Sequence, residues 1–175
     1  TEVYNTMSHP FDVFTTAVFS GQLLLTPCPA TQNTSLVESV DTLKQAGATG
    51  IITLMADAEL SENGAAELGQ VSQGMDLQWY QLPVADEAAP AADFQAAWQQ
   101  HSAEILKRLQ AGETLAIHCK GGSGRTGLIA AQIVLAAGGE LNATIAAVQA
   151  LRPRALQYPA HLAYLQQLAS QGSKT

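Results

Sequence analysis

Two short, continuous apolar runs constrain the fold of this 175-residue chain more than any other feature of its sequence. They cover residues 49–55 and residues 114–118. Runs of this length without polar alternation are typical of strands buried on both faces, as in parallel sheets covered by helices. We therefore expect an α/β domain in which strands alternate with helices.

The segments around these runs have helical or strand periodicity. Helices are predicted at residues 35–46, 62–73, 91–110, 126–137, 142–152 and 159–170, and further strands at residues 12–18, 22–26 and 77–82. Ser20-Gly21 is expected as a turn, Asn142 as an N-cap and Pro159 as the first residue of the last helix. The prediction is a single domain, residues 9–172, with a mostly parallel sheet of about five strands. Residues 1–8 are expected to be a tag or a disordered tail, with Met7 as the natural initiator.

Composition excludes several classes of protein. With 47% hydrophobic and 13% charged residues, the chain is too apolar for a disordered protein. No apolar run approaches the ~20 residues of a membrane-spanning helix. Two cysteines, Cys28 and Cys119, provide neither a disulfide framework nor zinc-ligand spacing. We expect a soluble, cytoplasmic protein that needs no cofactor and no metal.

The charges are distributed unevenly along the chain. The net charge is -7, but residues 1–106 hold thirteen acids and one base, whereas residues 107–175 hold seven bases and two acids. The acidic excess argues against nucleic acid as a partner. The late bases indicate a local anion site, with chance clustering among few bases as the alternative.

Residues 118–127, His-Cys-Lys-Gly-Gly-Ser-Gly-Arg-Thr-Gly, join a predicted buried strand to a predicted buried helix. Three glycines allow successive N–H groups to converge on one point at a helix N-terminus, where an anion is favoured. The same field stabilises a thiolate at Cys119. Arg125 offers a planar fork for two anionic oxygens. Together these groups indicate thiolate attack on a phosphoryl group.

This segment matches the pattern Cys-x5-Arg-(Ser/Thr) with a preceding His, and so resembles the signature of the cysteine-dependent protein tyrosine and dual-specificity phosphatases. The resemblance implies that Cys119 is the nucleophile that forms a phosphocysteine and that Arg125 binds the phosphate. It also implies that Thr126 assists departure of the sulfur, with capping of the following helix as the alternative. The implied phosphate-binding residues are Lys120, Gly121, Gly122, Ser123, Gly124 and Arg125. His118 is expected to organise the loop.

The resemblance extends along most of the chain. Residues 82–86, Leu-Pro-Val-Ala-Asp, resemble the general-acid loop of the family, which makes Asp86 the implied acid. Glu87 is the nearest competitor, with Asp57 and Asp93 further away. Residues 151–157 resemble a segment whose glutamine, here Gln157, positions the hydrolytic water in some members. Residues 25–28, the helix after them and the strand at 51–54 resemble the cyclin-dependent kinase-associated phosphatase type.

The implied activity is hydrolysis of a phosphorylated protein or peptide, at phosphotyrosine and also at phosphoserine or phosphothreonine. The short chain favours the compact dual-specificity class, and an acid that precedes the cysteine excludes the low-molecular-weight phosphatases. Lys120 resembles the phosphoinositide type, so a phosphoinositide or another small phosphoester is the alternative substrate. A non-catalytic phosphate-binding module and a persulfide-carrying sulfurtransferase are the remaining alternatives.

Three further residues have open roles. Cys28 is expected to be a small buried thiol, with a resolving thiol for Cys119 as the alternative. Arg152 and Arg154 lie in the segment that resembles a neighbouring wall of the site. With Lys120 and Arg125, they are expected to face one anion.

Overall fold

The computed structural model of the chain describes residues 8–172, so the expected tail lies, apart from Ser8, outside the described residues. The strands are β1 (Asp12–Thr16), β2 (Phe19–Thr26), β3 (Ala48–Thr53), β4 (Gln78–Gln81) and β5 (Thr114–His118). The helices are α1 (Leu36–Gln45), α2 (Asp57–Glu62), α3 (Leu68–Gly74), α4 (Ala92–Gln110), α5 (Gly124–Ala136), α6 (Leu141–Leu151) and α7 (Pro159–Gly172).

The five strands form one sheet in the order β1-β2-β5-β3-β4. β1 is antiparallel to β2, and the other neighbouring pairs are parallel. In the parallel pairs, His118 is level with Thr26 and with Thr53, and Thr53 is level with Gln81. The predicted α/β domain with a mostly parallel sheet is confirmed. Its four parallel strands end along one edge, where ligands bind in such folds.

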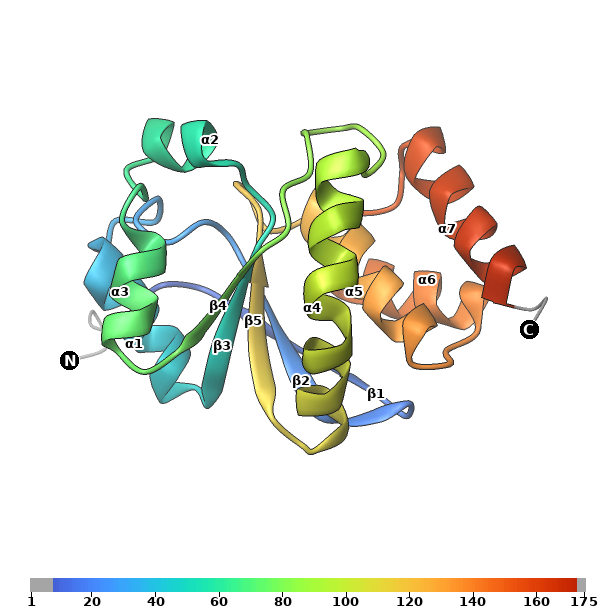
Figure 1. The fold of residues 1–175 in the computed structure, drawn as a ribbon, viewed down its shortest axis with the longest axis horizontal. Coiled ribbons are helices and arrows are strands. Elements are labelled where there is room, and N and C mark those ends of the chain that lie inside the picture. Colours follow the sequence, from blue (N-terminus) through green and yellow to red (C-terminus); the bar gives the residue numbers. More distant parts are fainter. Residues whose placement is uncertain (1–7, 173–175) are drawn as a thin grey trace.

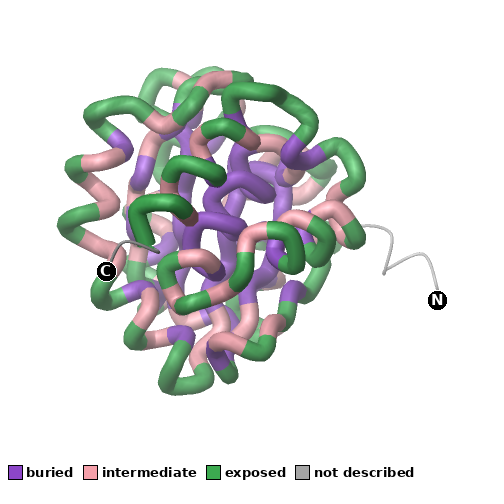
Figure 2. The backbone as a smooth tube through the Cα atoms, turned by 90° about the vertical axis from the view of Figure 1, so that its right-hand side faces the viewer, coloured by how far each residue is buried: buried purple, intermediate pink, exposed green. Residues whose placement is uncertain are grey.

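Helices cover both faces of the sheet. Figure 1 shows α1 and α3 on one side and α4, α5, α6 and α7 on the other. β5 contributes to the apolar clusters on both faces, with Leu115 and Ile117 in one and Ala116 in the other. The buried residues form the centre of the molecule and the exposed ones its outer turns (Figure 2). A strand buried on both faces explains the continuous apolar run of its sequence.

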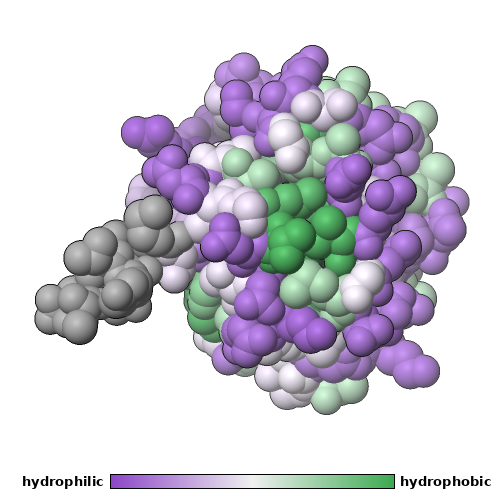
Figure 3. Space-filling model, turned by 90° about the vertical axis from the view of Figure 1, so that its left-hand side faces the viewer, coloured by the Kyte–Doolittle hydropathy of each residue, from purple (hydrophilic) through white to green (hydrophobic). Residues whose placement is uncertain are grey.

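The surface over α1 and α3 is less uniformly polar. Figure 3 shows an apolar patch on this side of the molecule, surrounded by hydrophilic residues. Leu36 of α1 and Val71 of α3 are partly buried apolar residues of these helices, and Met75 follows α3. Val37 of α1 is 55% exposed.

Three local expectations were wrong. The predicted helix at 62–73 is helical only in its second half, as α3, because α2 ends at Glu62 with Asn63 as its C-cap and Gly64 has a φ of +74°. The first turn lies at residues 17–18, and Gly21 stays within β2, where a Cβ would collide with the backbone carbonyl of Glu113. The N-cap of α6 is Glu140, whose carboxylate accepts the N–H groups of the first turn, rather than Asn142.

Candidate active site

One cavity opens at the carboxyl edge of the sheet, with a volume of about 470 Å³. Two segments border it, here named the glycine-rich loop (residues 120–124) and the Asp86 loop (residues 83–91). The residues that line the cavity are Thr31, Gln32, Asp86, Cys119, Lys120, Gly121, Ser123, Gly124, Arg125, Arg154 and Tyr158. The structure therefore brings the sequence-predicted nucleophile, arginine and acid to one cavity.

The glycine-rich loop is fixed from behind. Gly122 has a φ of +80°, and a Cβ on it would lie 2.7 Å from Pro27 N and from Thr26 C. Arg152 Nε donates to the carbonyl oxygen of Gly122 at 2.7 Å. Within residues 8–172, no hydrogen bond uses the N–H groups of Gly121, Gly122 or Ser123. Free N–H groups at the start of α5 are suited to hold an anion.

Cys119 lies at the bottom of the cavity, where it is only 3% exposed. Its Sγ accepts a hydrogen bond from Thr126 Oγ1 at 3.1 Å. Thr126 is inside the first turn of α5, whose N-cap position is Ser123, so the threonine hydroxyl serves the sulfur and does not occupy the capping position. A hydroxyl donor at this distance stabilises negative charge on the sulfur.

His118 is fully buried and connects the cysteine to the sheet. Trp79 Nε1 donates to Thr53 Oγ1 at 2.8 Å, and that hydroxyl lies 2.8 Å from His118 Nε2. His118 Nδ1 lies 3.1 Å from the carbonyl oxygen of Cys119. Burial lowers the pKa of His118 to about 4, so the ring is neutral at pH 7, with its proton on Nδ1 for the carbonyl. This arrangement supports the expected organising role.

Arg125 is 2% exposed, and its five N–H donors can be accounted for one by one. Nη1 donates to Glu59 Oε1 at 2.7 Å and to the carbonyl oxygen of Val84 at 3.0 Å, and Nη2 donates to Glu59 Oε2 at 2.8 Å. Nε is buried without a hydrogen-bond partner among the described residues. The free donors are therefore Nε–H and the second Nη2–H, which lie on one edge of the guanidinium.

Burial alone would lower the pKa of Arg125. The hydrogen bonds to Glu59 and the negative charges of Cys119, Glu59 and Asp86 outweigh that effect and raise the pKa above its ordinary value. The guanidinium therefore stays charged, and its free edge can bind two oxygens of one anion.

Asp86 and Glu87 are neighbours that point to different partners. Asp86 Oδ1 lies 3.6 Å from Arg125 Nε, and the Asp86 side chain is 71% exposed. Glu87 has a φ of +63° and accepts a hydrogen bond from Tyr158 OH at 2.7 Å. Asp86 lines the cavity and Glu87 does not. Of the two carboxylates, Asp86 has the position of an acid for a bound ligand.

The other competing acids also have partners elsewhere. Asp57 accepts a hydrogen bond from Gln81 Nε2 at 2.9 Å. Asp93 lies in the first turn of α4 and accepts the N–H group of Phe94. Neither residue lines the cavity.

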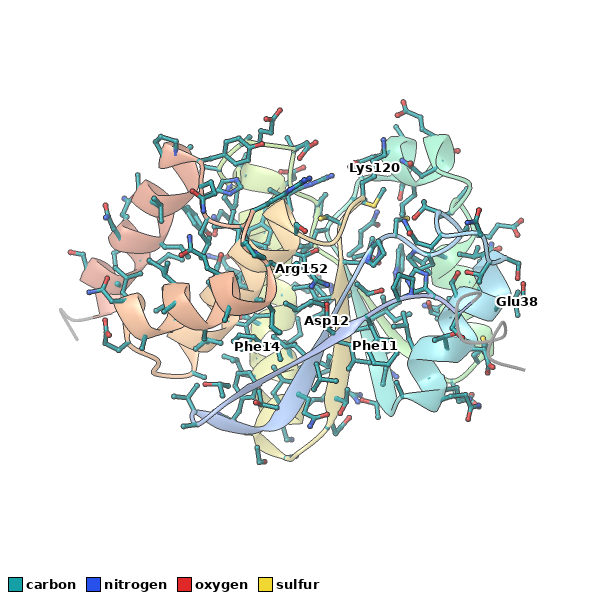
Figure 4. All side chains as sticks on the ribbon, turned by 180° about the vertical axis from the view of Figure 1, so that it is seen from behind. Phe11, Asp12, Phe14, Glu38, Lys120 and Arg152 are labelled. Carbon is teal, nitrogen blue, oxygen red and sulfur yellow. The ribbon has the colours of Figure 1, made fainter. Side chains whose placement is uncertain are left out.

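The late basic residues divide into two groups, which corrects part of the expectation. Arg152 does not face the cavity, because its guanidinium also donates to Leu25 O at 2.9 Å and to Asp12 Oδ2 at 2.5 Å. Figure 4 shows Arg152 and Asp12 close together, and Lys120 of the glycine-rich loop apart from them. Lys120 and Arg154 line the cavity, and neither forms an ion pair within residues 8–172.

Gln157 lies outside the cavity lining. Its Nε2 donates to the carbonyl oxygen of Pro153 at 3.0 Å. The predicted water-positioning role is therefore not supported by a contact with the cavity.

Sequence reasoning did not identify Glu59, the bidentate partner of Arg125. Glu59 lies on α2, 66 positions before Arg125. The only available signal was its place soon after the predicted strand at 49–55, at the carboxyl edge of a parallel sheet.

Cys28 and Cys119 belong to different apolar clusters. Cys28 packs in the cluster on the α1 and α3 side, and Cys119 in the cluster on the other side of the sheet. Burial, followed by the negative charges of Glu59 and Cys119, raises the pKa of the Cys28 thiol to about 12. Cys28 is therefore a neutral, buried thiol at pH 7, as expected from its sequence.

A larger cavity, about 660 Å³, lies between the C-terminal helices and away from Cys119. Glu140 lines this cavity, but its carboxylate accepts hydrogen bonds from the N–H groups of Asn142 and Ala143 at the start of α6. Among the described residues, no group of three or more His, Cys, Asp or Glu side chains could hold a metal ion. No helix in this part of the chain is long and apolar enough to cross a membrane.

A buried cysteine beneath a glycine-rich loop, at the carboxyl edge of a mostly parallel sheet, fits the class of the cysteine-dependent phosphatases. The family model PTP-SAK, described as a Swiss Army Knife protein DSP-PTPase phosphatase domain, matches residues 16–174. The chain belongs to this family and is a cysteine-dependent phosphatase of the dual-specificity type. No curated protein matches it in sequence.

Solved structures share the fold at low sequence identity. A kinase associated phosphatase (KAP) with its catalytic cysteine substituted by serine is 21% identical, with a TM-score of 0.83 over 96% of this chain and 98% of that one. PTPMT1 in complex with PI(5)P is 16% identical, with a TM-score of 0.68 over 90% and 95%. Human DUSP28 is 19% identical, with a TM-score of 0.64 over 94% and 95%. The predicted resemblance to the kinase-associated type is confirmed for the fold.

Proposed function

We propose that the protein hydrolyses phosphate monoesters through a phosphocysteine on Cys119, with phosphotyrosine peptides as the first substrate class. The free edge of Arg125 carries this proposal. Its two remaining donors, Nε–H and the second Nη2–H, belong to a side chain that lines the same cavity as Cys119 and Asp86. An edge of this kind matches two oxygens of a phosphoryl group.

The first step transfers the phosphoryl group to sulfur. The Cys119 thiolate attacks phosphorus, an S–P bond forms, and the P–O bond to the leaving group breaks. Arg125 and the N–H groups of the glycine-rich loop hold the equatorial oxygens. Asp86 gives its proton to the leaving oxygen.

The second step releases phosphate. Water attacks phosphorus, the Asp86 carboxylate takes a proton from that water, and the S–P bond breaks to regenerate the thiolate. The Thr126 hydroxyl, 3.1 Å from Sγ, stabilises the departing sulfur. Gln157 has no part in this scheme, because its amide is bonded to Pro153.

Hydrolysis of p-nitrophenyl phosphate in the presence of a chelator tests the scheme. We expect a burst of nitrophenol equal to the enzyme concentration, and Cys119→Ser should lower the rate at least about a thousandfold. Thr126→Val, which keeps the nucleophile, should slow the steady state more than the burst. Undiminished activity in Cys119→Ser, or activity abolished by the chelator, would exclude the mechanism.

A small phosphoester with a second anionic group, such as a phosphoinositide headgroup, is the second candidate substrate. Lys120 and Arg154 support it, since both line the cavity without an ion-pair partner among the described residues. Competing hydrolysis of a phosphotyrosine peptide and a soluble phosphoinositide separates the two classes. A larger kcat/KM for the phosphoinositide, lost in Arg154→Gln, would favour the second.

A further inference from the structure

The Asp86 loop is attached to the start of α7 by side chains that the proposed chemistry does not use. Tyr158 OH donates to Glu87 Oε1 at 2.7 Å. His161 Nε2 lies 3.1 Å from the carbonyl oxygen of Ala88. The rings of Tyr158 and His161 meet edge to face, with centroids 5.2 Å apart at 74°. Tyr158, just before α7, and His161, on α7, thus bond Glu87 and Ala88, the two residues that follow Asp86.

The Asp86 loop makes few other hydrogen bonds near Asp86. On the sheet side, its last hydrogen bonds are made by Val84, whose N–H donates to Leu54 O at 3.1 Å and whose carbonyl accepts from Arg125 Nη1 at 3.0 Å. Beyond it, Ala88 N donates within the loop to Ala85 O at 3.2 Å. Asp86 is held by no hydrogen bond among the described residues, and its carboxylate is mostly exposed. The position of Asp86 therefore depends on its neighbours.

The left-handed backbone of Glu87 separates the two adjacent carboxylates. A φ of +63° is unfavourable for a residue with a side chain and persists only where contacts hold it. The hydrogen bond from Tyr158 is such a contact. The Tyr158 pKa is raised, first by that hydrogen bond to Glu87, so the phenol stays protonated and able to donate at neutral pH.

We propose that Tyr158 and Glu87 form an anchor that positions Asp86 over the phosphoryl group, with Tyr158 as a positioning residue. Glu87 is then a structural carboxylate and not the acid. The inference rests on the proposed function, in which Asp86 protonates the leaving group. Proton transfer requires a heavy-atom separation of roughly 2.6–3.2 Å, so a loop that drifts by about 1 Å loses much of the rate.

The leaving group provides the readout. Phenyl phosphate needs the proton from Asp86, whereas p-nitrophenyl phosphate has a more stable leaving anion and needs it less. Asp86→Asn should lower kcat/KM about a hundredfold for phenyl phosphate and much less for p-nitrophenyl phosphate. Tyr158→Phe, which keeps the ring against His161, should give the same pattern at about tenfold.

Tyr164→Phe is the matched control. Tyr164 also lies on α7, but its hydroxyl donates to Gln132 Oε1 at 2.7 Å and accepts from Gln95 Nε2 at 3.0 Å, and neither partner belongs to the Asp86 loop. Its removal should change both substrates equally. In the Asp86→Asn background, Tyr158→Phe should have no further leaving-group effect, because the proton donor it positions is already absent.

Each outcome distinguishes the two proposals. If Asp86→Asn has no leaving-group dependence, the acid assignment fails. If it has one but Tyr158→Phe matches Tyr164→Phe, or affects both substrates equally, only the anchor is excluded. Glu87→Gln should behave like Tyr158→Phe, and a loss that exceeds that of Asp86→Asn would identify Glu87 as the acid and overturn the inference.

Discussion

The glycine-rich loop and the Asp86 loop border the same cavity, but the structure holds them in opposite ways. The glycine-rich loop lies against the backbone of Thr26 and Pro27, and a buried arginine and a buried histidine adjoin it. In the Asp86 loop, residues 85–87 are exposed, and the side chains of Tyr158 and His161 bond Glu87 and Ala88.

This difference fits the role proposed for each loop. A cradle for the charge of a transition state is effective when its dipoles are already oriented, and packing into the core maintains that orientation. An acid that later acts as a base needs access for a leaving group and then for water, which a buried carboxylate would lack. In the proposed mechanism, the rigid loop is therefore the one where negative charge accumulates, and the exposed loop is the one where protons and water exchange.

The largest effect is expected at Gly122. In Gly122→Ala, the new Cβ meets backbone atoms of Thr26 and Pro27 at a φ of +80°, so neither neighbour can move aside cheaply. The free energy of unfolding should fall by about 4 kcal/mol, measured by urea denaturation. Gly121→Ala is the control, since nothing lies within 4 Å of its Cβ. Equal stability of the two variants would show that the glycine-rich loop is not fixed by this packing.

A second effect concerns pH. Burial lowers the pKa of His118 to about 4, whereas the same imidazole in the unfolded chain titrates near its ordinary value of 6.5. Between these values the unfolded state binds a proton that the folded state does not, so stability falls as pH decreases from 6.5 to 4. The loss from His118 is about 3 kcal/mol. His9 and His161, whose pKa values burial also lowers, add to it in the same direction.

Urea midpoints at several pH values measure this loss, and the NMR chemical shifts of the His118 ring follow its own titration. The carboxylates with lowered pKa values, such as Glu113, act only below their ordinary range near 4.5, so the window above pH 5 belongs to the histidines. A His118 ring that titrates near 6.5, with constant stability down to pH 5, would contradict the buried neutral histidine.

The sequence predicted the rigid side of the site better than the exposed side. Residues 118–127 are contiguous, so Cys119, Arg125 and Thr126 could be placed by spacing and by the strand and helix around them. The burial of β5 on both faces followed from its continuous apolar run, and the place of the site from the rule that ligands bind at the carboxyl edge. The order of the strands was not predicted.

The remaining contacts depend on tertiary structure and could not be predicted. Glu59 reaches Arg125 only because β3 and β5 are neighbours in the sheet. Arg152 was expected at the anion, but it bonds carbonyl oxygens behind the loop, since residues 151–154 leave α6 on that side. Periodicity also could not show that residues 63–67 are not helical and lie between the end of α2 at Glu62 and the start of α3 at Leu68.

The smallest effect on stability is expected for Asp86→Asn, which tests the difference between the two loops most directly. Asp86→Asn removes an exposed carboxylate that has no hydrogen bond among the described residues and lies 3.6 Å from Arg125. Its free energy of unfolding should stay within about 0.5 kcal/mol of the wild type, because solvent screens the pair with Arg125. The same variant is expected to lose most of its rate with phenyl phosphate, so stability and activity should separate.

Glu59→Gln is the counterpart on the buried side. Glu59 is bonded to both Nη atoms of Arg125, so its substitution should lower stability and activity together. If Asp86→Asn proved as destabilising as Glu59→Gln, the Asp86 loop would be a packed part of the core. The division between a rigid charge cradle and an exposed, anchored acid would then not hold.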